Sequence, residues 1–163
     1  MWVIGEAFED WIFSGLSAWP DPGHEIKTDD LQRCPGGGAV ITSVAAARLG
    51  IPVHLLSALG AEHEALLVKE GVHVKNLAQA GDIPAVTIAL TTSKNRSFLT
   101  YNGANSNIES RFFEALKTLA IPTGTHIHCA FEPQSPALWA EWVVREPLYT
   151  SHRILAWPYR NTS

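Results

Sequence analysis

Short apolar runs alternate along the chain with stretches whose apolar residues recur about once per helical turn. Compact apolar runs bounded by Gly or Pro are typical of buried strands, and they occur at residues 2–5, 53–59, 126–131 and 153–157. Alanine-rich or amphipathic stretches predict helices at residues 40–49, 61–70, 108–119 and 136–145, the third of them capped by Asn107. Strands that alternate with helices predict an α/β fold, with a mostly parallel sheet and flanking helices.

One segment departs from this alternation. Residues 85–92 and 97–101 are rich in β-branched and aromatic residues, and they flank the polar tip Ser93–Arg96. This pattern predicts a β-hairpin. The extended, polar residues 24–34 are its expected partner in a small second sheet, and residues 11–16 also have an extended pattern.

Composition narrows the class of protein and its partners. The chain has 163 residues, 46% of them hydrophobic and 17% charged, as in a single globular domain. The net charge is −4 and the twelve Lys and Arg are dispersed, so neither nucleic acid nor an anionic membrane is an expected partner. The first residues lack the basic start of a signal peptide, and no apolar run reaches the roughly 18 residues of a membrane span. Two cysteines, Cys34 and Cys129, form no disulfide framework, so we expect a cytoplasmic protein.

Three consecutive glycines, Gly36–Gly38, open the helix predicted at residues 40–49. Glycines at a helix start let a ligand approach free backbone N–H groups, but they also serve as a tight turn. The spacing is not that of a dinucleotide or phosphate loop, because Ala39 and Ile41 replace further glycines and no Gly-Lys-Ser/Thr follows. The residues alone leave both interpretations open.

Several motifs in the same order resemble the ribokinase-like (PfkB) carbohydrate kinases. They are "WVIGEAFED" at the N-terminus, "GGGAV" followed by "VAAARLG", "PVHLLSALG", "IPAVTIALTTSKNRSFLTYNGAN" and "THIHCAFEP". The resemblance covers nearly the whole chain, and it matches the N-terminal half of the family. It implies a truncated Rossmann-like core at residues 1–163, with a β lid made of segments at about 14–34 and 84–102.

The resemblance implies roles for six residues in binding a sugar or nucleoside. Asp10 would accept hydrogen bonds from sugar hydroxyls, and Gly36, Gly37 and Gly38 would line the sugar with backbone amides. Asn105 and Glu132 are further candidates in the same pocket. Each has a simpler alternative: Asp10 as an exposed loop carboxylate, Glu132 as an acid at a strand end, and Asn105 as a turn residue. The lid would cover the sugar and provide a homodimer interface.

The catalytic part of the family's pattern is not found in this sequence. Family members carry a Gly-Ala-Gly-Asp segment whose Asp is the catalytic base, with ATP and Mg²⁺ as cofactors. The only similar residues here are Ala80–Asp82, which lead through Pro84 into a strand and are therefore expected to form a turn. Ile41 and Trp157 stand where the family often has a sugar-binding Asn and an Asp. The segment from Gly60 to Gly71 is also shorter than the family's helix region.

These departures predict a substrate-binding and lid half that has no catalytic residues and is inactive as a kinase on its own. One alternative is a non-catalytic remnant that binds sugar or dimerises. Another is a small nucleotide-binding domain that uses the glycine triplet for phosphate. His126 and His128 share a strand face, but no third metal ligand is identifiable, so no metal site is expected.

Overall fold

The computed structural model describes residues 1–145 and 149–150. Its main sheet is parallel, with strand order β5-β4-β1-β8-β9. The strands are β1 (Trp2–Gly5), β4 (His54–Ser57), β5 (His73–Asn76), β8 (His126–Ala130) and β9 (Tyr149–Thr150). The helices are α1 (Gly38–Arg48), α2 (Ala61–Lys69), α3 (Ile108–Leu116) and α4 (Pro136–Arg145), with the 3₁₀ turn η1 (Gly103–Asn107) before α3. The predicted α/β class with a parallel sheet is confirmed.

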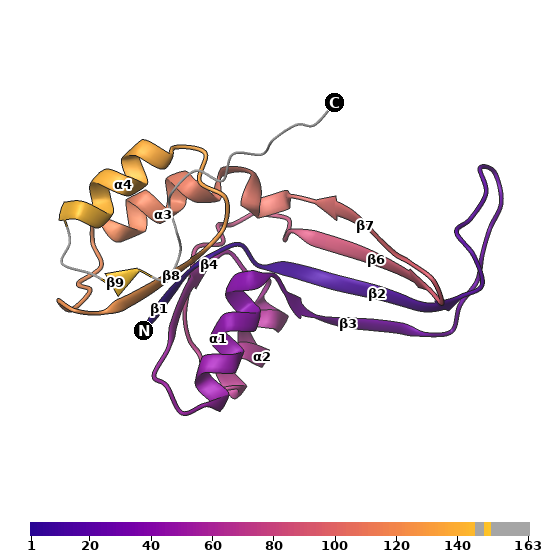
Figure 1. Cartoon of the computed structure of the whole chain (residues 1–163), viewed down its shortest axis with the longest axis horizontal. Helices are drawn as coiled ribbons and strands as arrows, with labels where there is room; N and C mark the ends of the chain where they lie inside the picture. Colours follow the sequence, from indigo (N-terminus) through magenta and orange to yellow (C-terminus); the bar gives the residue numbers. More distant parts are fainter. Residues whose placement is uncertain (146–148, 151–163) are drawn as a thin grey trace.

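Helices cover both faces of this sheet, with α1 and α2 on one side and α3 and α4 on the other (Figure 1). Alternate residues of β1 therefore enter two separate cores, Val3 on the α1 side and Ile4 on the α3 side. On the α3 side the ring centroids of Phe112 and Phe131 lie 5.0 Å apart, as do those of Phe131 and Trp139. Burial on both faces explains why these strands are continuous apolar runs rather than alternating ones.

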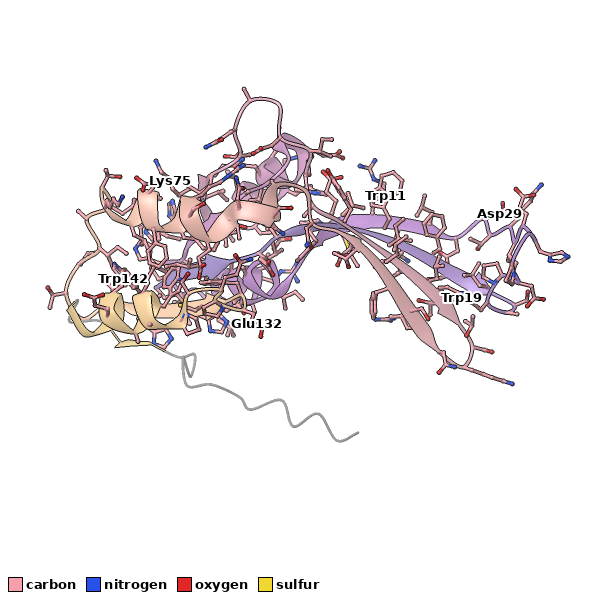
Figure 2. The ribbon with its side chains drawn as sticks, turned by 90° about the horizontal axis from the view of Figure 1, so that it is seen from above. Trp11, Trp19, Asp29, Lys75, Glu132 and Trp142 are labelled. Carbon is pink, nitrogen blue, oxygen red and sulfur yellow. The ribbon has the colours of Figure 1, made fainter. Side chains whose placement is uncertain are left out.

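A second sheet extends from this body as a long arm (Figure 1). Its strands are β2 (Phe8–Leu16), β3 (Leu31–Gly36), β6 (Val86–Thr92) and β7 (Arg96–Tyr101), in the order β3-β2-β6-β7. Beyond the root of the arm, which is the end where β1 leads into β2, no helix in the described part of the chain covers either face of the second sheet (Figures 1 and 2). The carboxyl end of β1 leads directly into β2, so the arm begins at the carboxyl edge of the main sheet.

Several predicted elements need correction. The β6–β7 hairpin is confirmed, but residues 24–34 do not pair with it directly, because β2 lies between β3 and β6. β2 pairs with β3 along one edge and with β6 along the other. The short edge strand β5 was not predicted, because its side chains are exposed or only half-buried. α3 ends at Leu116 rather than at 119, and Asn107 makes no side-chain capping hydrogen bond to it. The strand predicted at 153–157 lies outside the described residues.

Candidate functional site

The site begins where β1 continues into the arm. Asp10 lies near the start of β2, opposite Cys34 of β3 and Thr87 of β6. Its side chain is half-buried, so it is not the exposed loop carboxylate of the simpler interpretation. Because carboxyl ends of neighbouring parallel strands converge at this edge, Asp10 stands where α/β proteins bind their ligands.

The glycine triplet contacts the β1–β2 segment, and the three glycines differ in the space that a side chain would have. A Cβ on Gly36 would overlap the Asp10 carboxylate. Gly37 has a φ of +93°, and a Cβ there would lie 2.6 Å from the Glu6 carbonyl oxygen. A Cβ on Gly38 would make an ordinary contact of 3.5 Å with Ala130. The fold itself therefore requires a glycine at position 37, whereas a side chain at position 36 would displace the Asp10 carboxylate, which lies against the backbone just before α1.

Burial dominates the electrostatics around Asp10. It raises the pKa of Asp10, while the charge of His63 acts in the opposite direction. Burial, and then the nearby Asp10 charge, raise the pKa of the Cys34 thiol. Burial and the charge of Glu132 raise the pKa of Glu6. The junction thus gathers carboxylates that have lost part of their hydration, and a ligand with hydroxyl donors would restore their hydrogen bonds.

Asn105 connects η1 to the same junction. Its side chain is 5% exposed, and its Nδ2 atom donates a hydrogen bond of 2.9 Å to the Ala7 carbonyl oxygen. This bond ties η1 to the segment between β1 and β2. Its Oδ1 atom is buried and accepts no hydrogen bond from the described residues.

Glu132 and Ile41 contribute less to this junction. Glu132 follows β8 and is exposed, and its charge acts on Glu6 (Figure 2). Ile41, in the first turn of α1, is 66% exposed and presents an apolar side chain where the resemblance expects a sugar-binding amide. The structure therefore brings Asp10 and the glycine triplet together, places Asn105 beside the segment that leads to them, and gives Glu132 only an electrostatic link.

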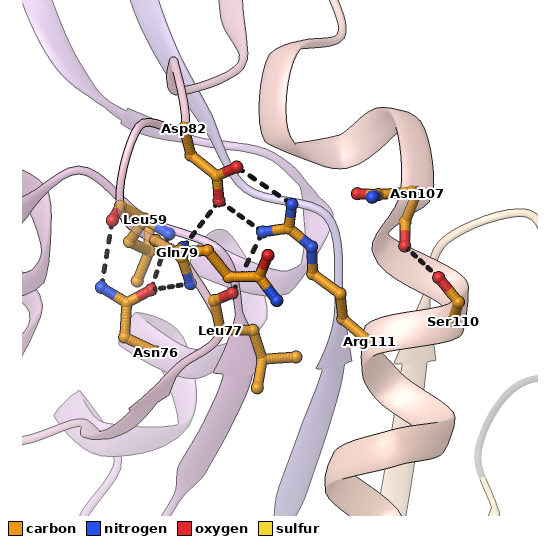
Figure 3. A network of polar contacts seen from close by, with 9 residues as sticks. Leu59, Asn76, Leu77, Gln79, Asp82, Asn107, Ser110 and Arg111 are labelled. Atoms are coloured by element: carbon orange, nitrogen blue, oxygen red, sulfur yellow. Dashed lines mark hydrogen bonds and ion pairs between the residues drawn. The ribbon is translucent and has the colours of Figure 1, made fainter.

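Asp82 is engaged in a separate network (Figure 3). Its backbone N–H donates to the Gln79 carbonyl oxygen at 3.0 Å, which confirms the predicted turn. Its carboxylate accepts hydrogen bonds from both Nη atoms of Arg111 and from the Gln79 N–H, the last at 2.7 Å. The hydrogen bond from Arg111 is the main cause that lowers the pKa of Asp82 to about 2. A carboxylate held in this way does not serve as a general base near neutral pH.

Two open hollows, of about 370 and 350 Å³, border this Asp82–Arg111 link. Both are lined by Asp82 and Ala104, but neither is lined by Asp10 or the glycine triplet. Both hollows lie beside the end of the arm that joins the main sheet, and Asp10 lines neither of them. Within the described residues, Asp10 stands at an open junction rather than inside either hollow.

Two observations on the described residues bear on the metal and phosphate sites that the resemblance implies. Within residues 1–145 and 149–150, no three His, Cys, Asp or Glu side chains lie close enough to bind a metal ion. Ala39 and Val40 follow the glycine triplet, so the Lys and Ser or Thr of a phosphate loop are not present there. No helix in the part of the chain that the structure describes is long and apolar enough to cross a membrane.

Sequence reasoning missed two residues that shape this junction, Glu9 and His63. The Nδ1 atom of His63 in α2 lies 3.6 Å from Oε1 of Glu9. The helical period does place His63 and Leu67 on one face of α2, and both are buried. No pattern in the sequence indicates that this face meets β2.

Residues 2–137 match the family described as pfkB family carbohydrate kinase. A search among curated proteins finds no match. Among solved structures, ribokinase from Cryptococcus neoformans var. grubii serotype A in complex with ADP is similar, with 20% identity and a TM-score of 0.69 over 91% of this chain and 48% of that one.

Two further ribokinases give the same picture. The Giardia lamblia enzyme shares 17% identity, with a TM-score of 0.68 over 91% of this chain and 50% of its own. The Arabidopsis thaliana enzyme, complexed with ribose and ATP, shares 16% identity, with a TM-score of 0.59 over 91% of this chain and 51% of its own. At these identities the likeness shows the fold, and the chain spans about half the length of each structure.

Proposed function

Because this chain belongs to the pfkB family of carbohydrate kinases, we propose that it forms the sugar-binding half of a kinase active site, together with its lid. The observation that carries this proposal is the Asp10 carboxylate packed against Gly36 at the carboxyl edge of the sheet. The lid consists of the segments at about 14–34 and 84–102, within the sheet of β2, β3, β6 and β7, which we call the lid sheet.

The substrate we propose is a sugar, or the sugar part of a nucleoside. A carboxylate accepts hydrogen bonds from two adjacent hydroxyl groups, and such charge-assisted bonds are stronger than neutral ones. Asp10 is the main ligand in this proposal. Backbone amides of Gly36–Gly38, the free Oδ1 of Asn105 and the carboxylate of Glu132 complete the pocket. The lid sheet folds over the sugar and excludes water.

In the complete reaction of the family, ATP supplies the phosphoryl group and Mg²⁺ neutralises its charge. We propose that the described residues bind neither group well on their own, and we assign no catalytic residue in this chain. The one Ala-Gly-Asp segment, Ala80–Asp82, is in a turn, with its carboxylate bound to Arg111. We therefore propose that the 163-residue chain binds sugar but transfers no phosphate.

Two measurements on the purified chain test this proposal. A thermal-shift panel of D-ribose, D-fructose and adenosine is expected to show stabilisation by at least one compound. Stabilisation by ATP but by no sugar would favour a nucleotide-binding domain instead. Sugar-dependent ADP release is expected to equal the no-sugar blank, and release above the blank would contradict the inactivity.

A second candidate function is a non-catalytic module that dimerises through the lid sheet. The observation that favours it is the set of large apolar side chains exposed there: Leu31 (46%), Phe98 (63%), Leu99 (69%) and Tyr101 (53%). An open sheet with exposed apolar residues is a typical site of protein association. Light scattering is expected to give the mass of a dimer, whereas a monomer at all concentrations would argue against this role.

The cysteines Cys34 and Cys129 are free, which supports a cytoplasmic protein.

A further inference from the structure

A second group of polar side chains lies on the face of β2 opposite to that of Asp10. Glu9 and Asp10 are consecutive on β2, so their side chains leave opposite faces of the lid sheet. Asp10 lies against Gly36, whereas Glu9 meets α2. There the Nδ1 atom of His63 is 3.6 Å from Oε1 of Glu9, within the range of an ion pair but beyond that of a hydrogen bond.

This contact is largely shielded from water. The side chain of His63 is 4% exposed and that of Glu9 is 18% exposed. The Glu9 carboxylate also packs on the backbone where α2 begins, since a Cβ on Gly60 would lie 2.8 Å from Oε1. The contact is an ion pair only when His63 carries its proton, and in such a place its charge is less screened than that of a surface pair.

The outer part of the group also joins α2 to the lid sheet. The Nη2 atom of Arg33 in β3 lies 3.8 Å from Oε2 of Glu9 and 3.9 Å from Oε2 of Glu62 in α2. The Arg33 guanidinium lies 4.8 Å from the centroid of the Trp11 ring. Arg33 and Glu62 are well exposed, and exposed pairs contribute little. The buried contact of His63 with Glu9 is therefore the principal polar link between α2 and the root of β2.

We propose that His63 is a positioning residue for Asp10: by holding the Glu9 carboxylate, it fixes the root of β2 on α2 and so keeps the Asp10 carboxylate against Gly36. The proposal rests on the proposed role of Asp10 in sugar binding. Glu9 and Asp10 share a peptide bond, so a shift of Glu9 moves Asp10 as well. Asp10 has little freedom to compensate, because its carboxylate already contacts the Gly36 backbone.

His63 also acts on the charge of Asp10. When His63 carries its proton, its charge lowers the pKa of Asp10, against the larger effect of burial. The other titratable group facing Asp10 is Cys34 of β3, whose own pKa Asp10 raises. Removing the imidazole is therefore expected to move the titration of Asp10 to higher pH, further from that of an ordinary aspartate.

The test uses the free 163-residue protein and needs no sugar. The ¹³C carboxyl signal of Asp10 is titrated by NMR, and amide hydrogen exchange is measured along β1, β2 and β3. His63→Phe keeps a ring without the charge, and His63→Asn keeps a polar side chain without the charge. Glu9→Gln weakens the same contact from the lid side and leaves the α2 core intact. His73→Phe, at an exposed position on β5, is the matched control.

We expect His63→Phe to shift the Asp10 titration to higher pH and to speed exchange at the root of β2, but not in β1. His63→Asn, which carries no charge, should shift the Asp10 titration to higher pH and speed exchange in the same way as His63→Phe. Glu9→Gln, which removes the partner charge, should also speed exchange at the root of β2. The control should change neither quantity. An unchanged Asp10 titration in His63→Phe, or exchange that rises equally in β1, would overturn the proposal. If no sugar of the panel binds, the proposed function is contradicted, whereas the titration and exchange results still test the positioning role of His63.

Discussion

Asp10 is the residue on which the proposed function depends, and its environment predicts a pH dependence. Burial raises its pKa above that of an ordinary aspartate, so it takes up a proton at a higher pH than usual. Protonation removes the charge that strengthens its hydrogen bonds to hydroxyl groups. We therefore expect the affinity for the tightest-binding sugar of the panel to fall on acidification, beginning above the usual Asp range.

Calorimetric titrations from about pH 7.5 to pH 4.5 measure this dependence. Asp10→Asn, which cannot titrate at this position, is the control and should bind weakly and evenly over the same range. A wild-type affinity that stays constant down to pH 4.5 would contradict an ionised Asp10 as the sugar ligand.

Asp82 predicts a pH effect of the opposite sign, on stability. The hydrogen bonds from Arg111, and then from the Gln79 N–H, lower its pKa from the ordinary aspartate value to about 2. A depressed carboxyl pKa stabilises the folded state above the unfolded pKa, and this stabilisation is lost as the pH falls through the folded pKa. Asp82→Asn should therefore lower the Tm near neutral pH, and its difference from wild type should shrink between about pH 4 and pH 2.

Thermal unfolding followed by circular dichroism checks this prediction. The control is Asp29→Asn, at an exposed position in the connection between β2 and β3, which should leave the Tm nearly unchanged (Figure 2). A constant difference between Asp82→Asn and wild type over the whole pH range would show that the ion pair does not act through its charge.

Among single residues, the sequence identified Asp10 and the glycine triplet because a motif links them. The reasons for the glycines became visible only in space: Gly36 makes room for the Asp10 carboxylate, and Gly37 has a positive φ. Glu9 and His63 could not be paired in advance, because they are 54 positions apart (63 − 9) and no local pattern connects them. Long-range contacts of this kind follow from topology rather than from periodicity.

At the scale of elements, the lid sheet predicts a dimer interface. Leu99 on β7 is 69% exposed, and burying a leucine stabilises an interface by about 1.5–3 kcal/mol. Leu99→Asp would also place a charge in an apolar contact, so we expect the dimer to weaken at least about tenfold.

Light scattering over a concentration series measures this change. Leu138→Asp is the matched control, because Leu138 is 53% exposed on α4, away from the lid sheet. Equal dimerisation of the Leu99 variant and wild type would place the interface elsewhere.

The main elements were predictable where the hydrophobic periodicity agrees with the Gly, Pro and capping residues at the ends of each element. The four helices and the β6–β7 hairpin follow directly from spacing and composition. The edge strand β5 was missed, because its half-buried side chains resemble a polar loop. The start of β2 at Phe8 was also missed, as was its position between β3 and β6. An edge strand and a strand shared by two neighbours both depend on pairing partners, which local sequence does not specify.

At the scale of the whole molecule, the order β5-β4-β1-β8-β9 explains where the site lies. β1 is a central strand, and its carboxyl end leads through Glu6 and Ala7 into the lid sheet. α1 begins at the same edge, immediately after β3. A covered parallel sheet and an open arm therefore meet at one junction, and the residues proposed to bind sugar gather there.

The most direct test of this account is calorimetric binding of the tightest-binding sugar of the panel to wild type and to Asp10→Asn. Replacing a charge-assisted acceptor costs about 1.5–3 kcal/mol, so the account predicts that the variant binds roughly tenfold to a hundredfold more weakly. Both proteins should keep the same circular dichroism spectrum. Equal affinity of the two proteins would contradict the central claim that Asp10 is the sugar-binding residue of this chain.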